Sequence, residues 1–512
     1  MIAFISGLVL LTGGYFIYGR LTQSAVRPDP ARPTPALSRA DGVDYVAMPT
    51  WRVYLIQLLN IAGLGPVFGP ILGALWGPQV FLWVVFGCIL GGAVHDFLIG
   101  AMSIRNDGAG LPDLIGHYLG TGARHFATFF ILLLMLLVGT VFVKGPALLI
   151  VELLPAETVG SLFGSGATEW LNTSVFGLSV WMWTVMLVIY IYYILATLLA
   201  IDTIIGRFYP FFALALLVMV AGLGFALLTG RISAMPFTLD NLHPKHLPAW
   251  PLIFITVSCG AVSGFHATQS PLMARCLKSE KRMRLVFYGA MIAEGVIALI
   301  WSATALGFYN GIEGLSAALA KGGPGAVVRD ACVATMGMAG GALAVLGVVV
   351  LPITSGDTAF RVGRLILADY FHVPQKRLLN RYILVVPLFV LSFALNFVNF
   401  DVVWRYFGWA NQTLAAVALW CAAVFLARRH SRWWLAFIPA VFMTVVTTTY
   451  ILVEAVGFGL EPRVGTILGV AIGAVCAAFF LWRRSKLAPE EDKPAMVAQP
   501  TETERSTDSL AC

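Results

Sequence analysis

The sequence is poor in charged residues. Asp, Glu, Lys and Arg make up 12% of its 512 residues, about half of the share in an average soluble domain. None of its seven cysteines stands in a Cys-x-x-Cys pair, so the spacings typical of zinc sites and of disulfide frameworks are missing. The eight histidines are scattered along the chain, whereas a membrane enzyme would favour His, Asp and Glu clustered at an interface. These shortages argue against a soluble catalytic domain, a cysteine-based metal site and an enzyme.

Long apolar runs take the place of the missing charges. Hydrophobic residues make up 59% of the chain, and its 51 glycines suit membrane helices that approach one another closely. A bilayer core requires about 20 apolar residues per helix. The runs predict an all-α integral membrane protein with about thirteen transmembrane helices, at about residues 2–18, 53–76, 79–104, 124–151, 178–201, 208–229, 249–270, 285–309, 333–356, 381–399, 402–427, 432–455 and 464–482.

The distribution of positive charge predicts the topology. With the N-terminus outside the membrane, 26 of the 33 Lys and Arg residues fall in segments assigned to the cytoplasm and 7 in segments assigned to the outside. Such a bias is what the positive-inside rule describes. It also accounts for the formal net charge of +7 without a nucleic-acid partner. We therefore expect a multi-pass protein of the bacterial inner membrane with a cytoplasmic C-terminus.

Two segments lack the character of membrane helices. Residues 20–50 contain four closely spaced prolines and predict an extended cytoplasmic linker. Residues 485–512 are rich in Pro, Glu, Thr and Ser and predict a disordered cytoplasmic tail. The first apolar run, in residues 1–19, lacks the basic start and the small-residue cleavage site of a signal peptide. We interpret it as an extra N-terminal transmembrane helix that is retained.

Two of the predicted spans are interrupted. Residues 61–70 read Ile-Ala-Gly-Leu-Gly-Pro-Val-Phe-Gly-Pro, and each proline removes a backbone donor and disturbs the preceding turn. Residues 258–266 read Ser-Cys-Gly-Ala-Val-Ser-Gly-Phe-His. Broken helices in lipid are tolerated where they are buried in protein or line a cavity, and their freed carbonyls and half-helix ends can bind substrates or ions. The alternative for the first segment is a packing stripe of small residues, formed by Gly65, Gly69, Gly73 and Gly77.

The spacing of the interruptions suggests an internal repeat. The two broken spans are five apart, so they run in opposite directions, and spans two to six can be an inverted copy of spans seven to eleven. Paired interruptions in two such halves indicate a transporter binding site. The predicted organisation is the helix of residues 1–19, the linker 20–50, a first repeat 51–230, a second repeat 248–427, two C-terminal helices within 432–484, and the tail 485–512.

Ionisable residues inside the spans are costly and are usually functional. Asp96, beside His95, and Glu294 lie within predicted spans and are candidates for ion coupling. Asp357 is a third candidate, but its spacing from Arg361 and Arg364 also fits a structural ion-pair cluster. Thr354 and Ser355 precede it as possible cation ligands. Lys144 can extend towards the outer interface, and the adjacent amides Asn411 and Gln412 can either join helices or line the cavity.

These stretches resemble the carbon starvation protein A (CstA) family. The matching stretches are Ile61-Ala62-Gly63-Leu64-Gly65-Pro66 with Gly69-Pro70, Gly92-Ala93-Val94-His95-Asp96-Phe97, Cys259-Gly260-Ala261-Val262-Ser263-Gly264-Phe265-His266-Ala267, Tyr288-Gly289-Ala290-Met291 with Glu294, Asp357 with Arg361 and Arg364, and Phe407-Gly408 with Ala410-Asn411-Gln412. One departure is a pair of histidines that familiar members carry just before the first break, where this chain has Gln57-Leu58.

The resemblance implies a secondary transporter of the amino acid–polyamine–organocation type, with a LeuT-like five-plus-five inverted repeat. It implies ion-coupled uptake of pyruvate, a similar small carboxylate or peptides during nutrient limitation. We expect no bound cofactor and no resident metal ion, with H⁺ or Na⁺ as the coupling ion. The alternatives are a channel, which would need a continuous polar pore, and a membrane-embedded nutrient sensor. The sequence does not indicate an oligomeric state.

The predicted site combines the two breaks with the polar residues of the later spans. The candidate substrate-binding residues are Gly63, Gly65, Pro66, Gly260, Ser263, Gly264, His266, Asn411 and Gln412. The candidate ion-coupling residues are Asp96, Glu294, Thr354, Ser355 and Asp357.

Overall fold

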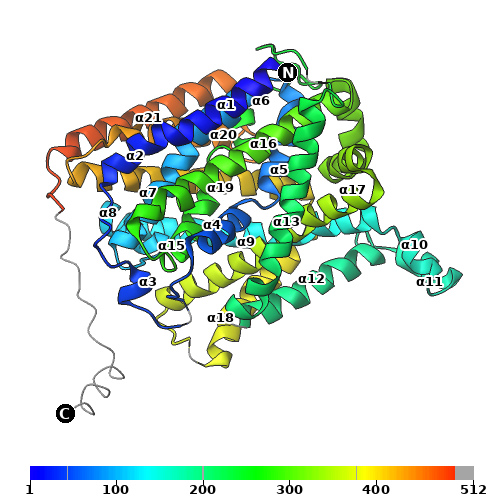
Figure 1. The fold of residues 1–512 in the computed structure, drawn as a ribbon, viewed down its shortest axis with the longest axis horizontal. Helices are drawn as coiled ribbons and strands as arrows, with labels where there is room; N and C mark the ends of the chain where they lie inside the picture. The colour runs from blue at the N-terminus through cyan, green and yellow to red at the C-terminus, as the bar shows by residue number, and fades with distance from the viewer. Residues whose placement is uncertain (43, 199–200, 234, 376, 491–512) are drawn as a thin grey trace.

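The structure is a computed structural model that describes residues 1–42, 44–198, 201–233, 235–375 and 377–490. These residues form a bundle of helices (Figure 1). Its one small sheet pairs β1 (Ser174–Val175) with β2 (Leu178–Ser179) in antiparallel register. The all-α membrane class predicted from the apolar runs is therefore confirmed at the level of a many-helix membrane protein.

Within the described residues, nine helices are long and apolar enough to cross a membrane, or ten if the bent pair α4–α5 counts as one span. The nine are Ile2–Val26 (α1 Ile2–Phe16 and α2 Tyr18–Val26), Val80–Arg105 (α6 Val80–Leu82, η2 Trp83–Gly92 and α7 Ala93–Arg105), α9 (Thr121–Leu153), Glu280–Phe308 (η3 Glu280–Arg282, η4 Arg284–Tyr288 and α16 Gly289–Phe308), α17 (Ile312–Tyr370), α18 (Leu378–Leu395), α19 (Phe400–Arg428), α20 (Trp434–Val453) and α21 (Pro462–Arg484).

The remaining helices are short, bent or only partly described. The bent pair is α4 (Thr50–Ile61) with α5 (Gly65–Gly73) and η1 (Ala74–Trp76), and the second interrupted segment is α14 (Leu252–Thr256) with α15 (Gly264–Ala274). α12 (Val180–Leu198) and α13 (Ile201–Leu228) contain shorter apolar stretches. The other helices are α3 (Pro35–Ser38), α8 (Leu111–Leu119), α10 (Ala156–Ser161) and α11 (Ser165–Asn172).

The long helix α17 differs from the prediction of a loop followed by a span at 333–356. Gly323 and Gly337 carry positive φ angles of 65° and 71°, so α17 consists of successive helical stretches joined at two kinks. Glycine adopts this backbone conformation without steric cost. Residues before the predicted span are therefore helical as well.

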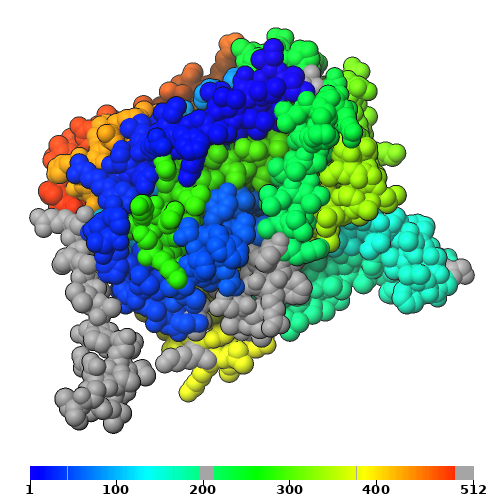
Figure 2. Space-filling model, viewed as in Figure 1, coloured from blue at the N-terminus to red at the C-terminus, as the bar shows by residue number. Residues whose placement is uncertain are grey.

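The central helices bury most of their surface, while several peripheral helices do not. The Val80–Arg105 and Glu280–Phe308 helices, α9 and α19 lie in the interior, and α1, α18 and α21 expose most of their apolar side chains. Leu162 and Phe163 are also exposed, on the α10–α11 arm that projects from the side of the bundle (Figure 2). Such exposure is expected of side chains that face lipid rather than water.

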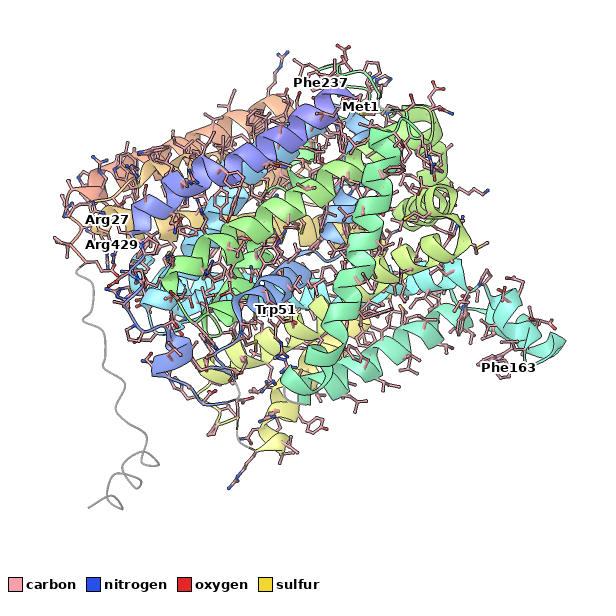
Figure 3. All side chains as sticks on the ribbon, in the orientation of Figure 1. Met1, Arg27, Trp51, Phe163, Phe237 and Arg429 are labelled. Atoms are coloured by element: carbon pink, nitrogen blue, oxygen red, sulfur yellow. The ribbon has the colours of Figure 1, made fainter. Side chains whose placement is uncertain are left out.

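Segments assigned by sequence to the same side of the membrane lie together. Met1 and Phe237 lie at one end of the molecule, and Arg27 and Arg429 lie at the other (Figure 3). The Ser431 hydroxyl donates to the Ala25 carbonyl at 2.6 Å, which joins two segments assigned to the cytoplasm. On the opposite side, contacts join residues 76–79 to residues 240–248. These contacts agree with the grouping that the charge pattern predicts for these four segments.

Candidate functional site

The first predicted break is present in the structure. α4 ends at Ile61 and α5 begins at Gly65, and the two axes differ by 46°. Pro66 lies in the first turn of α5, where its missing N–H leaves no hydrogen bond unmade. On α17, the Ser355 hydroxyl donates to the Asn60 carbonyl at 3.1 Å. This contact satisfies a carbonyl near the end of α4, where helical partners run out.

The second predicted break is wider. α14 ends at Thr256 and α15 begins at Gly264, so residues 257–263 are not helical. Gly260 has a φ of 87°, a conformation that favours glycine. The Gly260 N–H donates to Glu294 Oε1 on α16 at 3.2 Å. The Glu294 carboxylate thus accepts a hydrogen bond from a backbone N–H that has no helical partner, because the helix is interrupted there.

The two breaks pack directly against each other. A Cβ atom added to Gly65 would lie 2.3 Å from Cys259 Cβ and Sγ, and one added to Gly69 would lie 2.8 Å from the Thr256 carbonyl oxygen. A Cβ on Gly73 would lie 2.3 Å from Val257 Cγ2. The small residues Gly65, Gly69 and Gly73 therefore form the surface on which the second break packs. These contacts support the packing interpretation of the glycine stripe.

The two adjacent amides on α19 cap the half-helices of the second break. Asn411 Oδ1 accepts hydrogen bonds from the Phe265 N–H at 2.7 Å and from the Ser263 hydroxyl at 3.2 Å. Gln412 Nε2 donates to the Phe254 carbonyl at 2.9 Å. One amide therefore satisfies the N-terminus of α15 and the other satisfies the C-terminal part of α14, as helix ends require. These bonds agree with the interpretation of the two amides as helix connectors.

Four ionisable side chains form a buried chain beside the breaks. Asp96 Oδ1 lies 2.8 Å from His95 Nδ1, and Asp96 Oδ2 lies 3.0 Å from His266 Nδ1. On the other side of the same ring, His266 Nε2 lies 3.5 Å from Glu294 Oε2. All four side chains are fully buried. The structure thus brings together Asp96 and Glu294 from the coupling set and His266 from the substrate set.

The four buried side chains His95, Asp96, His266 and Glu294 are stabilised by a proton shared between them or by another cation. A carboxylate only accepts hydrogen bonds, so ionised Asp96 places a proton on His266 Nδ1. In the neutral ring Nε2 is then an acceptor, and it faces Glu294, which is also an acceptor when ionised. Within the described part of the chain, His266 Nε2 and Glu294 Oε2 have no hydrogen-bond partner. Two buried carboxylates without a neutralising charge are costly, so one cation between the ring and Glu294 stabilises the cluster.

The other coupling candidates lie on α17 in a different arrangement. Asp357 Oδ1 lies 3.7 Å from an Arg361 guanidinium nitrogen one turn later, which fits the ion-pair alternative. The Thr354 and Ser355 hydroxyls both donate to the Leu351 carbonyl of their own helix, at 2.8 and 3.0 Å. The contact from Ser355 to Asn60 still ties this helix to the first break.

Lys144 has a structural partner at the end of another helix. Its ammonium group donates to the Asn396 and Val398 carbonyls, at 3.2 and 3.3 Å, directly after α18 ends at Leu395. The negative end of a helix dipole favours a cation at this place.

His95, a member of the cluster, and Cys259, which lies beside it, were not among the predicted site residues. His95 stands beside Asp96 in an apolar run. A histidine next to an acidic residue in a predicted span could have been identified from the sequence as a site residue. Cys259 lies in the second break, where only the fold places its sulfur against Gly65.

Further polar groups lie on α4 and α15, the helices on either side of the breaks. On α4 and α15, Gln57 Nε2 donates to Ser270 Oγ at 3.4 Å, and both residues are buried. The far end of α15 borders a cavity of about 410 Å³, a size common among small-molecule sites. Its charged lining residues are Asp44, Asp113, Arg124, Arg275 and Asp369.

Two interrupted helices in contact inside a bundle of apolar helices, with a buried ionisable cluster beside them, are typical of a multi-pass membrane transport protein. The sequence profile described as Carbon starvation protein CstA matches residues 1–163, 147–319 and 301–450. The chain therefore belongs to this family, and the resemblance found in its motifs is confirmed.

Three relatives illustrate the similarity. An uncharacterized membrane protein of Haemophilus influenzae is 43% identical over 63% of this chain and 95% of its own length. The peptide transporter CstA of Escherichia coli is 26% identical over 85% of this chain and 78% of its own. The pyruvate/proton symporter BtsT of Escherichia coli is 29% identical over 56% of this chain and 46% of its own. The relatives with named functions are transporters, in agreement with the prediction of a transporter rather than an enzyme.

Proposed function

We propose that this protein is a proton-coupled symporter that takes up a small carboxylate such as pyruvate, or a peptide, across the bacterial inner membrane during nutrient limitation. The observation that carries the proposal is the buried chain His95–Asp96–His266–Glu294 beside two crossed helix breaks. Buried chains of Asp, Glu and His are typical of proton relays in transporters. One relative carries the name pyruvate/proton symporter and another the name peptide transporter.

The donor atoms favour the proton over sodium. The cluster offers imidazole nitrogens and, at Cys259, a sulfur, whereas a sodium site in a broken helix is built from backbone carbonyls and other oxygens. The proposed architecture is thirteen spans with an outside N-terminus, a cytoplasmic C-terminus and inverted repeats at 51–230 and 248–427. Its support is the pair of breaks in contact and the same-side grouping of the loops.

Substrate would pass between the breaks and the cavity at the cytoplasmic end of α15. Gln57, Ser270 and Thr268 supply polar groups along this path. Arg124 and Arg275 line the cavity together with three aspartates, and Arg124 pairs with Asp113 at 2.8 Å. A carboxylate, which pyruvate and a peptide C-terminus share, would bind these arginines in competition with the aspartates.

Uptake by purified protein in liposomes tests the proposal. We expect labelled pyruvate or a labelled di- or tripeptide to accumulate above its outside concentration when an inward proton gradient is imposed. A protonophore should abolish accumulation, and a sodium gradient alone should not drive it. Equilibration without accumulation under every gradient would support a channel and overturn the symporter.

A further inference from the structure

Three side chains beside the breaks have the composition of a metal site. Cys259 Sγ, a His266 ring nitrogen and a Glu294 carboxylate oxygen all lie within 4.8 Å of one another, and all three residues are buried. Cys259 belongs to the non-helical segment, His266 to α15 and Glu294 to α16. Their separation along the chain is why no cysteine pair or histidine motif in the sequence indicates them.

The surrounding hydrogen bonds orient the ligands as in a metal centre. His266 binds Asp96 through Nδ1 at 3.0 Å, which leaves the Nε2 lone pair directed at Glu294. Glu294 accepts the Gly260 N–H with Oε1, which leaves Oε2 directed at His266. A histidine whose other nitrogen is held by a carboxylate is the usual arrangement around protein-bound zinc. His266 Nε2 and Glu294 Oε2 lie 3.5 Å from each other and neither has a hydrogen-bond partner in the described chain, so a cation bound between them would satisfy both.

The donor set selects the class of cation. One thiolate, one imidazole and one carboxylate suit Zn²⁺ and Co²⁺, whereas Mg²⁺ and Ca²⁺ prefer oxygen ligands alone. Metal–ligand bonds of about 2.0–2.3 Å place the donors of a tetrahedral zinc site about 3.5 Å apart. His266 Nε2 and Glu294 Oε2 already have this separation, at 3.5 Å, so Cys259 would move by up to about 1 Å to complete the site. Three protein ligands leave the fourth position open to water or to a substrate carboxylate.

We propose that Cys259, His266 and Glu294 bind a divalent transition-metal cation of the Zn²⁺ type at the crossing of the two breaks. The cation occupies the space between His266 and Glu294. Under the proposed function this is also the place of the coupling proton, so a bound metal ion blocks proton-driven accumulation. Metal binding itself does not depend on what the protein transports.

Cobalt is the probe, because a thiolate ligand gives Co²⁺ a charge-transfer band in the near ultraviolet. Co²⁺ is added to the purified, chelator-treated full-length protein in detergent. We expect this band, about one equivalent of bound Co²⁺, and displacement of Co²⁺ by Zn²⁺. Cys259→Ser should remove the band, and His266→Gln and Glu294→Gln should each weaken Co²⁺ binding at least tenfold. Cys332→Ser, at a buried cysteine of α17 outside the cluster, is the matched control and should keep the band.

X-ray absorption of the zinc-loaded parent protein is a second measurement that needs no variant. One sulfur and at least one nitrogen or oxygen in the first shell support the site, and a shell without sulfur overturns it. A parent protein without the cobalt band, or a band that persists in monodisperse Cys259→Ser, also overturns it. If the band appears as expected while uptake proves independent of a proton gradient, the metal site stands and the proposed function fails.

Discussion

Asp96 is the residue on which the ionisable cluster depends. Each of its two oxygens binds a ring nitrogen from a different histidine, so it fixes the proton positions of both rings. Its distance from His266 along the chain is 170 residues, and no local pattern could have paired them. The sequence identifies Asp96 and Glu294 individually, because a charge in an apolar run is conspicuous. It does not show that His266 stands between them.

Neutral isosteres of the two acids should uncouple transport. Asp96→Asn presents an amide N–H₂ to one ring, and Glu294→Gln removes the acceptor that faces His266, so the cluster no longer binds and releases a proton. We expect gradient-driven accumulation to fall at least tenfold in one or both variants, while exchange of labelled for unlabelled substrate continues. Both activities are measured in the same liposomes.

Ser302→Ala is the matched control for these variants. Ser302 is buried on the same helix as Glu294, and its hydroxyl donates only a bond to the Ala298 carbonyl of that helix. The Ser302→Ala variant should accumulate substrate to the same level as the parent protein. If Asp96→Asn and Glu294→Gln also do so, coupling lies elsewhere, and Asp357→Asn becomes the variant to measure.

The amide of Asn411 should contribute to stability. Asn411→Ala leaves the buried Phe265 N–H and Ser263 hydroxyl without the acceptor they now share, and an unsatisfied buried polar group costs about 1–3 kcal/mol. We expect a lower unfolding temperature in a thermal assay of the purified protein. Thr413→Ala, whose hydroxyl bonds to its own helix at Trp409, should change it little. Equal behaviour of the two variants would show that Asn411 is not a cap.

At the scale of the helical elements, sequence patterns located the breaks but not their contact. Glycine and proline inside apolar runs predict interruptions, and both occur at the predicted residues. The contact between Gly65 and Cys259 depends on the way two distant helices cross, which the patterns do not encode. The long helix α17 was predicted only in part, because the residues before 333 were assigned to a loop although they are helical and join the predicted span through kinks at Gly323 and Gly337.

A double-mutant cycle tests the contact between the breaks. Gly65→Ala introduces a Cβ at 2.3 Å from Cys259 Cβ and Sγ, and overpacking of this kind costs about 1–3 kcal/mol. Cys259→Gly removes both atoms, so the double variant should recover most of the lost stability and transport. Gly13→Ala on α1, where an added Cβ meets nothing within 4 Å, is the control. Additive losses in the double variant would show that Gly65 does not pack on Cys259.

At the scale of the whole molecule, the predicted linker of residues 20–50 forms hydrogen bonds with loops at one end of the helix bundle. Glu280 is buried and accepts from the Asp29 N–H at 2.8 Å. It also pairs with Arg105 through Nε at 2.7 Å. Further along the linker, the Met48 N–H donates to the Cys276 carbonyl at 3.1 Å. The prediction of an extended linker over residues 20–50 is wrong in part, because residues 20–26 continue the N-terminal span as α2 and residues 35–38 form α3. The prolines of the linker did not indicate these helices or these partners.

The same-side contacts lead to a topology prediction. Arg329 binds Glu152 at 2.6 Å on one side, and the Glu490 N–H binds the Arg428 carbonyl at 3.0 Å on the other. Each contact joins segments separated by an even number of predicted spans, as they must be if both lie on the same side. A missed or invented span between two such segments would place them on opposite sides. The contacts therefore support the order of the loops, while the Lys and Arg bias supports which side is the cytoplasm.

Reporter fusions test both points together. An alkaline phosphatase reporter, which is active outside the inner membrane, should be active when fused after about residues 165, 240 and 322. A fluorescent protein that folds in the cytoplasm should be bright after about residues 280, 372 and 490. In chain order, the first two sites lie outside, the next three lie inside, outside and inside, and the last lies inside. A reversal at one central site would break the thirteen-span order there, whereas a reversal at all six sites would keep the order and invert the orientation. Only a reversal at a single site would also place loops that contact each other in the structure on opposite sides of the membrane.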